Sequence, residues 1–438
     1  MDSSRKPLSR KRIRVVTLGC SKNTVDTEHL LSRLPEDEYE IAGEDGRPVD
    51  CLLVNTCGFI GDAKEESIQA VLEAVNSKSR GEAGEVVVFG CLSQRYSAEL
   101  PKEIPEVDAW YGARDLAPVL RHLGVDPGSS FRRKPKDGRS YAYLKISEGC
   151  DRRCSYCAIP FIRGAHRSVP MEKLVEEAEA LARSGVKELI LIAQDTTYYG
   201  LDLYRRRALA ELLRRLSEVE GIEWLRIHYS YPASFPEDVL TQMAENPKVC
   251  KYLDIPLQHI SDSVLDKMHR NVDGAWTRAL IARLRERVPG VVLRTTMIVG
   301  HPGETEADFE QLTEFVKEAK FERLGAFTYS EEEGTYGAEH FADDIPQEEK
   351  QRRLDVLMGV QSEISYAYNL SRVGSELRVL VDEVMPDGTL VCRSEFESPD
   401  VDGEIIVRPS PGRSVAAGDF IRVKVTACEE YDLEAEMI

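Results

Sequence analysis

Three cysteines, Cys150, Cys154 and Cys157, lie together in one short segment of the chain. They are separated by three residues and then by two, so their thiolates can reach three irons of a single [4Fe-4S] cube. Such clusters are normally closed by four cysteine thiolates, and this segment offers no fourth. A cluster held by three cysteines leaves one iron open to an outside ligand, and chemistry can occur at that iron.

A structural zinc site is the alternative interpretation, because closely spaced cysteines are common zinc ligands. Zinc sites usually add a second pair of ligands downstream, and no Cys-x-x-Cys or His-x-His pair follows here. Tyr156, just before the third cysteine, and the exit through Ala158-Ile159-Pro160 are also unlike a zinc knuckle. The segment therefore favours an iron–sulfur cluster.

A second group of cysteines follows the predicted strands of the first hundred residues. Hydrophobic patterning predicts strands at 13–17, 49–54 and 86–89, with helices after Asp26 and at 64–75. The loops after these strands carry Cys20, Cys57 and Cys91. Ligands collect at the carboxyl ends of parallel strands, so we expect the three thiols to hold a second cluster, again with one open iron. The alternative is three small buried side chains.

The composition is that of a globular protein in a reducing compartment. The 438 residues suggest about three domains. A net charge of −19 argues against broad adhesion to nucleic acid and favours a basic partner. Ten cysteines without a secretory signal indicate free thiols, and no segment approaches the roughly 18 apolar residues of a membrane span. We therefore expect a cytoplasmic protein with no membrane contact.

The chain is predicted to be an α/β protein with three domains. The expected boundaries are 1–127 for a small parallel α/β domain, 128–139 for a linker, 140–370 for a second α/β domain and 371–438 for a small antiparallel β-barrel. Strands are predicted at 141–147, 188–193, 224–228, 252–257, 291–299 and 324–328, with helices such as 171–183 and 277–287 between them. This alternation predicts a partial (βα)6 barrel with its chemistry at the carboxyl ends of the strands. After a charged helix at 347–369, strands at 377–381, 389–392, 404–407 and 419–425 predict a barrel of about five strands.

The motifs around these cysteines point to a known family. They are Thr-Leu-Gly-Cys-Ser-Lys-Asn at 17–23, the run beginning Val-Asn-Thr-Cys-Gly-Phe at 54–67, and Ser-Glu-Gly-Cys-Asp-Arg-Arg-Cys-Ser-Tyr-Cys at 147–157. The chain resembles the radical S-adenosylmethionine methylthiotransferases over its whole length. Branches that modify transfer RNA usually read Gly-Cys-Gln-Met-Asn at the first cysteine. The sequence here is closer to the branch that modifies an aspartate of small-subunit ribosomal protein twelve.

The resemblance implies an N-terminal cluster domain, a radical-SAM barrel, a C-terminal TRAM barrel and two [4Fe-4S] clusters. Cys150, Cys154 and Cys157 would hold the cluster whose open iron chelates S-adenosylmethionine, and Cys20, Cys57 and Cys91 the cluster that carries the transferred sulfur. One S-adenosylmethionine would methylate this sulfur, and a second would yield a 5′-deoxyadenosyl radical that abstracts hydrogen from the aspartate β-carbon. The protein would supply position and exclude water. The cysteines without matching partners are expected to be ordinary thiols: Cys51, Cys250, Cys392 and Cys428.

Further residues are assigned to cofactor binding by the resemblance, each beside a simpler interpretation. Tyr156 would lie beside the adenine or simply pack, Gln194 would bind the methionine part or be solvated, and Glu304 would approach the adenosine or stabilise a helix start. His259 is expected to be a hydrogen-bonded structural histidine rather than an active-site residue. Arg163, His166 and Arg167 are expected to form a solvated basic turn, or else to meet a carboxylate substrate. No residue is assigned a catalytic role.

The charge of the last domain bears on the partner. Residues 371–438 contain seven Lys and Arg against fifteen Asp and Glu, whereas small barrels that bind RNA present a positive groove. This favours a basic ribosomal protein as substrate. The alternatives are methylthiolation of an adenosine in transfer RNA and a zinc-bearing, noncatalytic ribosome-binding module. An electron donor such as flavodoxin or ferredoxin, and a monomeric state, are also expected.

Overall fold

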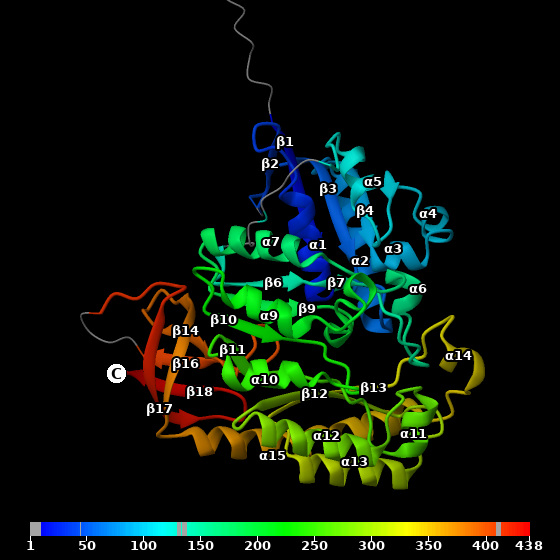
Figure 1. Cartoon of the computed structure of the whole chain (residues 1–438). Coiled ribbons are helices and arrows are strands. Elements are labelled where there is room, and N and C mark those ends of the chain that lie inside the picture. Colours follow the sequence, from blue (N-terminus) through cyan, green and yellow to red (C-terminus); the bar gives the residue numbers. More distant parts are fainter. Residues whose placement is uncertain (1–9, 44, 129–132, 134–137, 409–412) are drawn as a thin grey trace, which may run out of the picture. The chain divides into compact units, whose positions relative to one another are not determined.

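The computed structural model describes residues 10–43, 45–128, 133, 138–408 and 413–438 (Figure 1). The chain forms two compact units. The first comprises Met1–Lys134, Glu148–Asp151 and Ala158–His166, and the second comprises Pro135–Ser147, Arg152–Cys157 and Arg167–Ile438. Most of the predicted linker at 128–139 lies outside the described residues, so the domain boundaries stay a prediction. No helix in the described ranges has the length and apolar character needed to cross a membrane.

The first unit is built on a five-stranded parallel sheet in the order β2-β1-β3-β4-β5. Its strands are β1 Lys11–Thr17, β2 Tyr39–Ile41, β3 Val49–Thr56, β4 Ala83–Gly90 and β5 Ala109–Trp110. Its helices are α1 Ser21–Leu31, α2 Gly61–Ser79, α3 Cys91–Arg95, α4 Leu100–Glu103, α5 Ala117–His122 and α6 Ile159–Arg163. The three predicted strands are confirmed as β1, β3 and β4. They are neighbours, so their carboxyl ends share one edge of the sheet.

The alternation of side chains along β3 explains how this sheet is covered on both faces. Successive side chains of a strand point to opposite faces. Cys51 and Leu53 pack on one face together with α1 and α5, whereas Leu52 and Val54 pack on the other together with α2. The sheet is therefore buried on both sides, as parallel sheets usually are, and its functional groups must lie at its ends.

The second unit contains a six-stranded parallel sheet in the order β13-β12-β11-β10-β9-β6. Its strands are β6 Tyr141–Lys145, β9 Glu188–Ile192, β10 Trp224–Ile227, β11 Val249–Asp254, β12 Val292–Val299 and β13 Arg323–Thr328. The chain also has a separate two-stranded sheet of β7 Ser147–Glu148 and β8 Arg167–Ser168. Its helices are α7 Met171–Arg183, α8 Leu201–Tyr204, α9 Leu209–Ser217, α10 Glu237–Glu245, α11 Asp262–Lys267, α12 Gly274–Arg287, α13 Glu306–Ala319, α14 Tyr336–His340 and α15 Gln347–Arg372, with a 3-10 turn, η2, at Thr196–Tyr198. All six predicted strands are confirmed, in an open parallel sheet.

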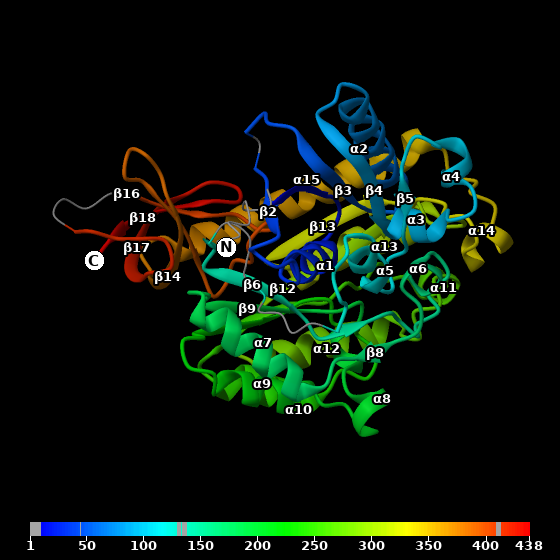
Figure 2. The same cartoon turned by 90° about the horizontal axis from the view of Figure 1, so that it is seen from above.

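Helices cover one face of this sheet in chain order. Figure 1 shows α7, α9, α10 and α12 one after another along it, and Figure 2 shows all four on the same side of the strands. Helix α15 packs against β12, β13 and α13. The apolar stripe of α7 explains its place: Met171, Leu174, Ala178 and Leu181 recur at helical spacing and are all buried. This arrangement places the crossover helices outside and leaves the strand ends to carry polar groups.

The C-terminal segment forms a closed five-stranded barrel in the order β14-β15-β16-β18-β17. Its strands are β14 Glu376–Val384, β15 Leu390–Ser394, β16 Ile405–Arg408, β17 Phe420–Cys428 and β18 Leu433–Met437. The small barrel predicted from the sequence is thus confirmed, but one detail differs. β16 and β18 pair in parallel, whereas the other four pairings are antiparallel.

Buried ion pairs join this barrel to the amino-terminal edge of the six-stranded sheet. Arg393 of β15 donates to Glu188, the first residue of β9, at 2.7 Å, and to Asp382 at 2.5 Å. Arg226 of β10 donates to the same Glu188 at 2.6 Å. Buried ion pairs also join Arg323 and Arg372 to Glu397. The hydroxyls of Tyr141 and Tyr143 donate hydrogen bonds to Asp400. The barrel therefore lies opposite the carboxyl-terminal strand edge, where the chemistry is expected.

Two buried histidines hold the loops after β11 and β12. Nδ1 of His259 accepts the backbone N–H of Ser261 at 3.0 Å, as the expected structural role requires, and the ring of His301 packs edge-on against Tyr329. Neither histidine is exposed. Burial lowers the pKa of His259 to about 3 and that of His301 to about 4. Both imidazoles are therefore neutral in the folded protein at neutral pH.

The buried pair at Glu188 predicts a large stability difference between two arginine substitutions. Arg393→Met should lower the free energy of unfolding by about 3–5 kcal/mol, because it removes one of the two arginines that neutralise the buried Glu188 and also the arginine that pairs with Asp382. Arg408→Met, in the same barrel, removes an exposed arginine that pairs with Glu434, and should change stability by less than about 0.5 kcal/mol. Urea unfolding of both variants measures the difference, and equal effects would contradict it.

The buried histidines predict a stability that depends on pH between 6.5 and about 4. An unfolded histidine binds a proton below about pH 6.5, whereas the folded protein keeps His259 neutral until about pH 3. As the pH falls, the unfolded state therefore binds protons before the folded state does. Each buried histidine then lowers the free energy of unfolding by up to about 1.4 kcal/mol per pH unit. His259→Gln should flatten the curve in this window. The matched control is His340→Gln, at an exposed position, and its curve of unfolding free energy against pH should run parallel to that of the wild type. A His259→Gln curve that also runs parallel to the wild type would refute the prediction.

Candidate metal and cofactor site

The three cysteines of the first unit lie at the carboxyl ends of neighbouring strands. Cys20 caps the start of α1 after β1, Cys57 follows β3 and Cys91 opens α3 directly after β4. Cys57 and Cys91 are buried, whereas Cys20 is exposed. The thiols lie close enough to influence one another electrostatically. The structure thus brings together the three residues that the sequence grouped.

A glycine allows two of these loops to meet. Gly19 has a φ of +87°, and a Cβ added to it would lie 2.8 Å from Cβ of Cys57. Any other residue at this position would be strained and would also displace Cys57. The glycine before Cys20 is therefore required for the approach of the β1 loop to the β3 loop.

A buried arginine lies against the third thiol of this group. Nε of Arg163 donates to Sγ of Cys91 at 3.2 Å, and its Nη1 donates to Asp26 at 2.7 Å and to Glu148 at 3.2 Å. Its Nη2 donates to Oδ1 of Asn23, which lies 3.7 Å from the same sulfur. Arg163 is only 2% exposed. A fixed cation beside a cysteine sulfur suits a thiolate that is bound to a metal.

The protonation of the buried thiols fits the same interpretation. Burial raises the pKa of Cys91 to about 12, although Arg163 opposes this rise, and burial also raises the pKa of Cys57. Without a metal these thiols stay protonated at neutral pH. A bound metal would supply the positive charge that buried thiolates require.

Within the described part of the chain, no three His, Cys, Asp or Glu side chains converge on a point that could hold one metal ion. This finding concerns sites for single ions. In an iron–sulfur cube each thiolate binds a different iron, so the ligands need not converge in that way. The donor set of three thiols with a neighbouring arginine fits a cluster.

The segment with the second cysteine triplet is divided between the two units. Cys150 belongs to the first unit, and Cys154 and Cys157 belong to the second. In the first unit the backbone N–H of Cys150 donates to the carbonyl of Gly164 at 3.0 Å. Gly149, at a φ of +82°, leaves no room for a side chain, since a Cβ would lie 2.2 Å from the carbonyl oxygen of Ala165. Residues 149 and 150 are thus fixed against the segment that ends the first unit.

In the second unit the cysteine segment packs against a second buried arginine. Nη1 of Arg270 lies 3.6 Å from Sγ of Cys154 and 3.3 Å from Oη of Tyr156. Its guanidinium also stacks on Tyr231 at 4.4 Å from the ring centroid. The backbone N–H of Ser155 donates to the carbonyl of Met268. The segment is therefore anchored by residues that follow β10 and β11.

The end of β9 supplies further polar groups to the same edge. Asp195 accepts Nε of Arg152 at 3.0 Å, and the guanidinium of Arg152 lies 3.9 Å from the centroid of Tyr231. Tyr231 is therefore stacked by two arginines. Gln194, one residue before Asp195, is half-buried at the carboxyl end of β9, where the sequence placed it.

Two of the buried oxygens near this edge have no hydrogen-bond partner among the described residues. They are Oε1 of Gln258, after β11, and Oγ of Ser155, in the cysteine segment. Gln258 also has a φ of +74°, which is unusual for a residue with a side chain. Unsatisfied buried polar atoms and strained backbone are typical of ligand sites. They fit a polar cofactor such as S-adenosylmethionine, whose ammonium and hydroxyl groups can donate.

Glu304 follows β12 and is almost fully buried. Its carboxylate accepts the backbone N–H of Gly300 at 2.7 Å and Nη1 of Arg353 at 2.9 Å. Burial raises its pKa. It is not the cap of α13, because Thr305 and Asp308 form a capping box there. Its role in cofactor binding stays a prediction.

The expected solvated turn after the cysteines is wrong for two of its three residues. Arg163 is buried and ion-paired as described above, and His166 is 6% exposed with its backbone N–H bonded to Asp151. Only Arg167 is exposed. For Arg163 the expectation failed because three of its partners, Asn23, Asp26 and Cys91, lie at least 72 residues away along the chain. Sequence reasoning also missed Arg270, whose neighbourhood carries no distinctive spacing.

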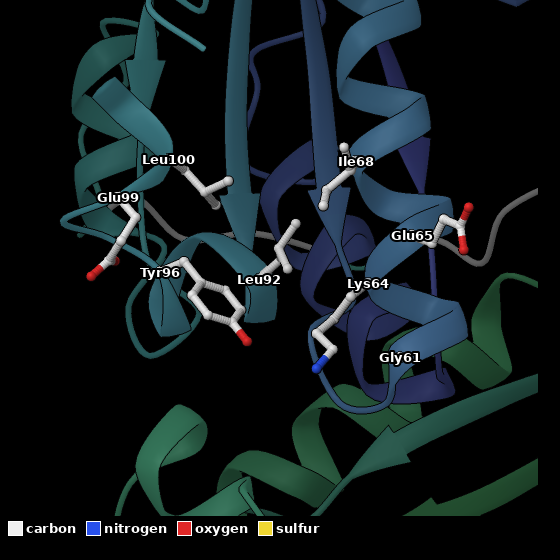
Figure 3. A pocket seen from close by; sticks show the side chains of 8 residues that line it. All are labelled: Gly61, Lys64, Glu65, Ile68, Leu92, Tyr96, Glu99 and Leu100. Carbon is white, nitrogen blue, oxygen red and sulfur yellow. The ribbon is translucent and has the colours of Figure 1, made fainter. Parts of the chain in front are cut away.

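An apolar cavity of about 400 Å³ lies elsewhere in the first unit (Figure 3). Its lining comes from α2, α3, the loop after α3 and the start of α4: Gly61, Lys64, Glu65, Ile68, Leu92, Tyr96, Glu99 and Leu100. Leu92 directly follows Cys91, but none of the predicted ligand residues lines the cavity. It is therefore separate from the candidate site.

Sequence comparisons relate each part of the chain to known families. Residues 144–316 match the Radical SAM superfamily, residues 12–112 match the Uncharacterized protein family UPF0004, and residues 373–438 match the TRAM domain. The solved structure of the radical S-adenosylmethionine methyltransferase TsrM from Kitasatospora setae is similar in fold, with a TM-score of 0.55 and 15% identity. The similarity covers 76% of this chain and 78% of that one.

Closer relatives share the whole length. A protein from Porphyromonas gingivalis named ribosomal protein uS12 methylthiotransferase RimO is 52% identical over 98% of this chain and 100% of its own. Proteins of the same name from Bacteroides fragilis and Flavobacterium johnsoniae are each 49% identical over 98% of this chain and at least 99% of their own. The chain is therefore an enzyme of the radical S-adenosylmethionine methylthiotransferase family and belongs to its RimO branch.

Proposed function

We propose that this enzyme inserts a methylthio group at the β-carbon of an aspartate of ribosomal protein uS12. The relatives named for this activity support the substrate. The observation that carries the proposal is the convergence of Cys20, Cys57 and Cys91 at neighbouring strand ends, in a chain that also holds a Cys-x3-Cys-x2-Cys segment. A radical source needs only that segment, whereas a second cluster provides a place for the sulfur to be transferred.

The proposal includes two [4Fe-4S] clusters and two molecules of S-adenosylmethionine. Cys20, Cys57 and Cys91 would hold the sulfur-carrying cluster. Cys150, Cys154 and Cys157 would hold the other, an assignment that rests on their spacing in the sequence. Together the bound groups would supply a methyl group, the sulfur and a 5′-deoxyadenosyl radical, while the chain binds, orients and excludes water.

Three further residues are proposed to bind S-adenosylmethionine. Tyr156 is half-buried in the cysteine segment and has the flat ring that an adenine can stack on. Gln194 would bind the methionine part from the end of β9. Glu304 would act from the end of β12 by fixing the backbone of Gly300, which can then approach the adenosine.

The charges of the C-terminal barrel favour a basic protein over RNA. Arg372 and Arg393 are buried against carboxylates, and so cannot contact phosphates. The exposed Arg378, Arg408 and Arg422 each pair with a glutamate. Five of the seven cations in residues 371–438 are thus paired with carboxylates, and acidic residues outnumber basic ones by fifteen to seven. Because phosphate backbones are bound by available cations, this excess of negative charge suits a positively charged partner better than RNA. We also propose a cytoplasmic monomer reduced by a flavodoxin or ferredoxin.

Iron content tests the two-cluster proposal. The anaerobically reconstituted protein should hold about eight irons per chain, as two [4Fe-4S] clusters require. Replacing Cys20, Cys57 and Cys91 by alanine, or Cys150, Cys154 and Cys157, should leave about four irons in each case. The control Cys428→Ala should keep the full number. Zinc in place of iron, or a triple variant that loses all of its iron, would contradict the proposal.

The substrate proposal is tested by mass spectrometry. Reconstituted enzyme, reductant and S-adenosylmethionine should add one methylthio group to an aspartate of purified uS12, and each triple variant should abolish the addition. Transfer RNA supplied in place of uS12 should remain unmodified. A methylthiolated adenosine with an unchanged uS12 would instead establish the RNA-directed activity.

A further inference from the structure

Among the buried arginines that the structure describes, Arg270 differs in the groups that its charged guanidinium contacts. It is 4% exposed, and Nη2 donates to the carbonyl of Pro256 at 2.5 Å. Its remaining contacts are Sγ of Cys154, Oη of Tyr156 and the ring face of Tyr231. In the described residues none of these groups is a carboxylate.

The other buried arginines meet carboxylates. Arg163 pairs with Asp26 and Glu148, and Arg226 pairs with Glu188. An arginine side chain stays charged in proteins, and a buried charge without an opposite charge is costly. Arg270 therefore lacks a negatively charged partner in the described structure. A negative charge close to Sγ of Cys154 would supply one.

We propose that Arg270 is a positioning residue that balances the charge of the iron–sulfur cluster bound through Cys154 and makes this cluster easier to reduce. The proposal rests on the proposed binding of a cluster by Cys150, Cys154 and Cys157. A cluster-bound thiolate places negative charge at the sulfur that Arg270 contacts. One-electron reduction adds one more negative charge to the cluster, and a fixed cation stabilises the reduced form more than the oxidised form.

The anchoring of Arg270 also explains how the cluster would be held. The guanidinium bridges the cysteine segment after β6 and the carbonyl of Pro256 after β11. The hydroxyl of Tyr231, after β10, donates to the backbone carbonyl of Arg270 at 2.6 Å. Both the charge and its position are thus fixed by three loops of the same strand edge, and the cation does not need to reorganise when the cluster is reduced.

Two substitutions separate charge from hydrogen bonding. Arg270→Lys keeps the charge and loses the planar fork, whereas Arg270→Gln keeps hydrogen-bond donors and loses the charge. The control is Arg153→Gln, since Arg153 is adjacent to Cys154 in sequence but exposed, so water screens its charge. All three variants are made in a parent protein in which Cys20, Cys57 and Cys91 are replaced by alanine. Only the cluster at Cys150, Cys154 and Cys157 then contributes to the redox signal.

Anaerobic redox titration with dithionite, followed by electron paramagnetic resonance, gives the reduction potential of each variant. Arg270→Gln should reduce the equilibrium constant for one-electron reduction at least tenfold, which corresponds to a potential about 59 mV lower. Arg270→Lys should stay within about threefold of the parent, as should Arg153→Gln. A potential for Arg270→Gln equal to that of Arg153→Gln would overturn the proposal.

Iron analysis separates this proposal from the one on which it rests. A parent without iron would refute the cluster at Cys154 itself. If Arg270→Gln alone fails to hold iron, the thermal unfolding of the metal-free proteins decides. Without a cluster the charge of Arg270 has no partner, so metal-free Arg270→Gln should be at least as stable as the metal-free parent. A lower unfolding midpoint would show that Arg270 is a structural residue and would refute the proposal.

Discussion

The parallel pairing of β1, β3 and β4 is the constraint on which the candidate site depends. Parallel strands bring their carboxyl ends to one edge of a sheet, and the crossover helices return the chain to the other edge. Each of these three strands ends in a short loop that carries a cysteine. The pairing of the backbone therefore brings together residues that are separated by more than thirty positions in the sequence, and Gly19 allows the final approach of two of their loops. The second sheet repeats the principle with the polar groups after β9, β10 and β11.

Buried arginines then determine the electrostatic environment of the sulfur atoms. Arg163 contacts Cys91 while two carboxylates neutralise its charge, whereas Arg270 contacts Cys154 without such a partner. An arginine whose charge is neutralised by carboxylates orients a cysteine ligand but has little effect on the charge of that ligand. An arginine without such a partner also shifts the electron affinity of the cluster that the cysteine binds. This difference suits the two clusters that we propose, because only the proposed radical source would pass an electron to S-adenosylmethionine. A third set of buried arginines, around Glu188 and Glu397, serves the C-terminal barrel instead.

The sequence predicted the helices and strands whose residues show a clear local pattern of polar and apolar side chains. The amphipathic run of α7 was predicted at 171–183, and its bounds are Met171–Arg183. β18 was not located, because Leu433–Met437 is short and contains two glutamates and an alanine, which are poor strand formers. The six cysteines could be chosen because spacing and strand ends are visible in a sequence. The arginines could not, since Arg163 and Cys91 are 72 residues apart and Arg270 and Cys154 are 116 apart, and no local pattern connects them.

The central claim is that a radical derived from S-adenosylmethionine acts on the β-carbon of an aspartate in uS12, beside a second cluster that holds the sulfur. The most direct measurement follows the hydrogen atom that is removed. When uS12 is labelled with deuterium at the β-carbons of its aspartates, turnover by the reconstituted enzyme should yield 5′-deoxyadenosine that contains deuterium, in proportion to the methylthiolated protein. Methylthiolated uS12 formed together with unlabelled 5′-deoxyadenosine would contradict the account.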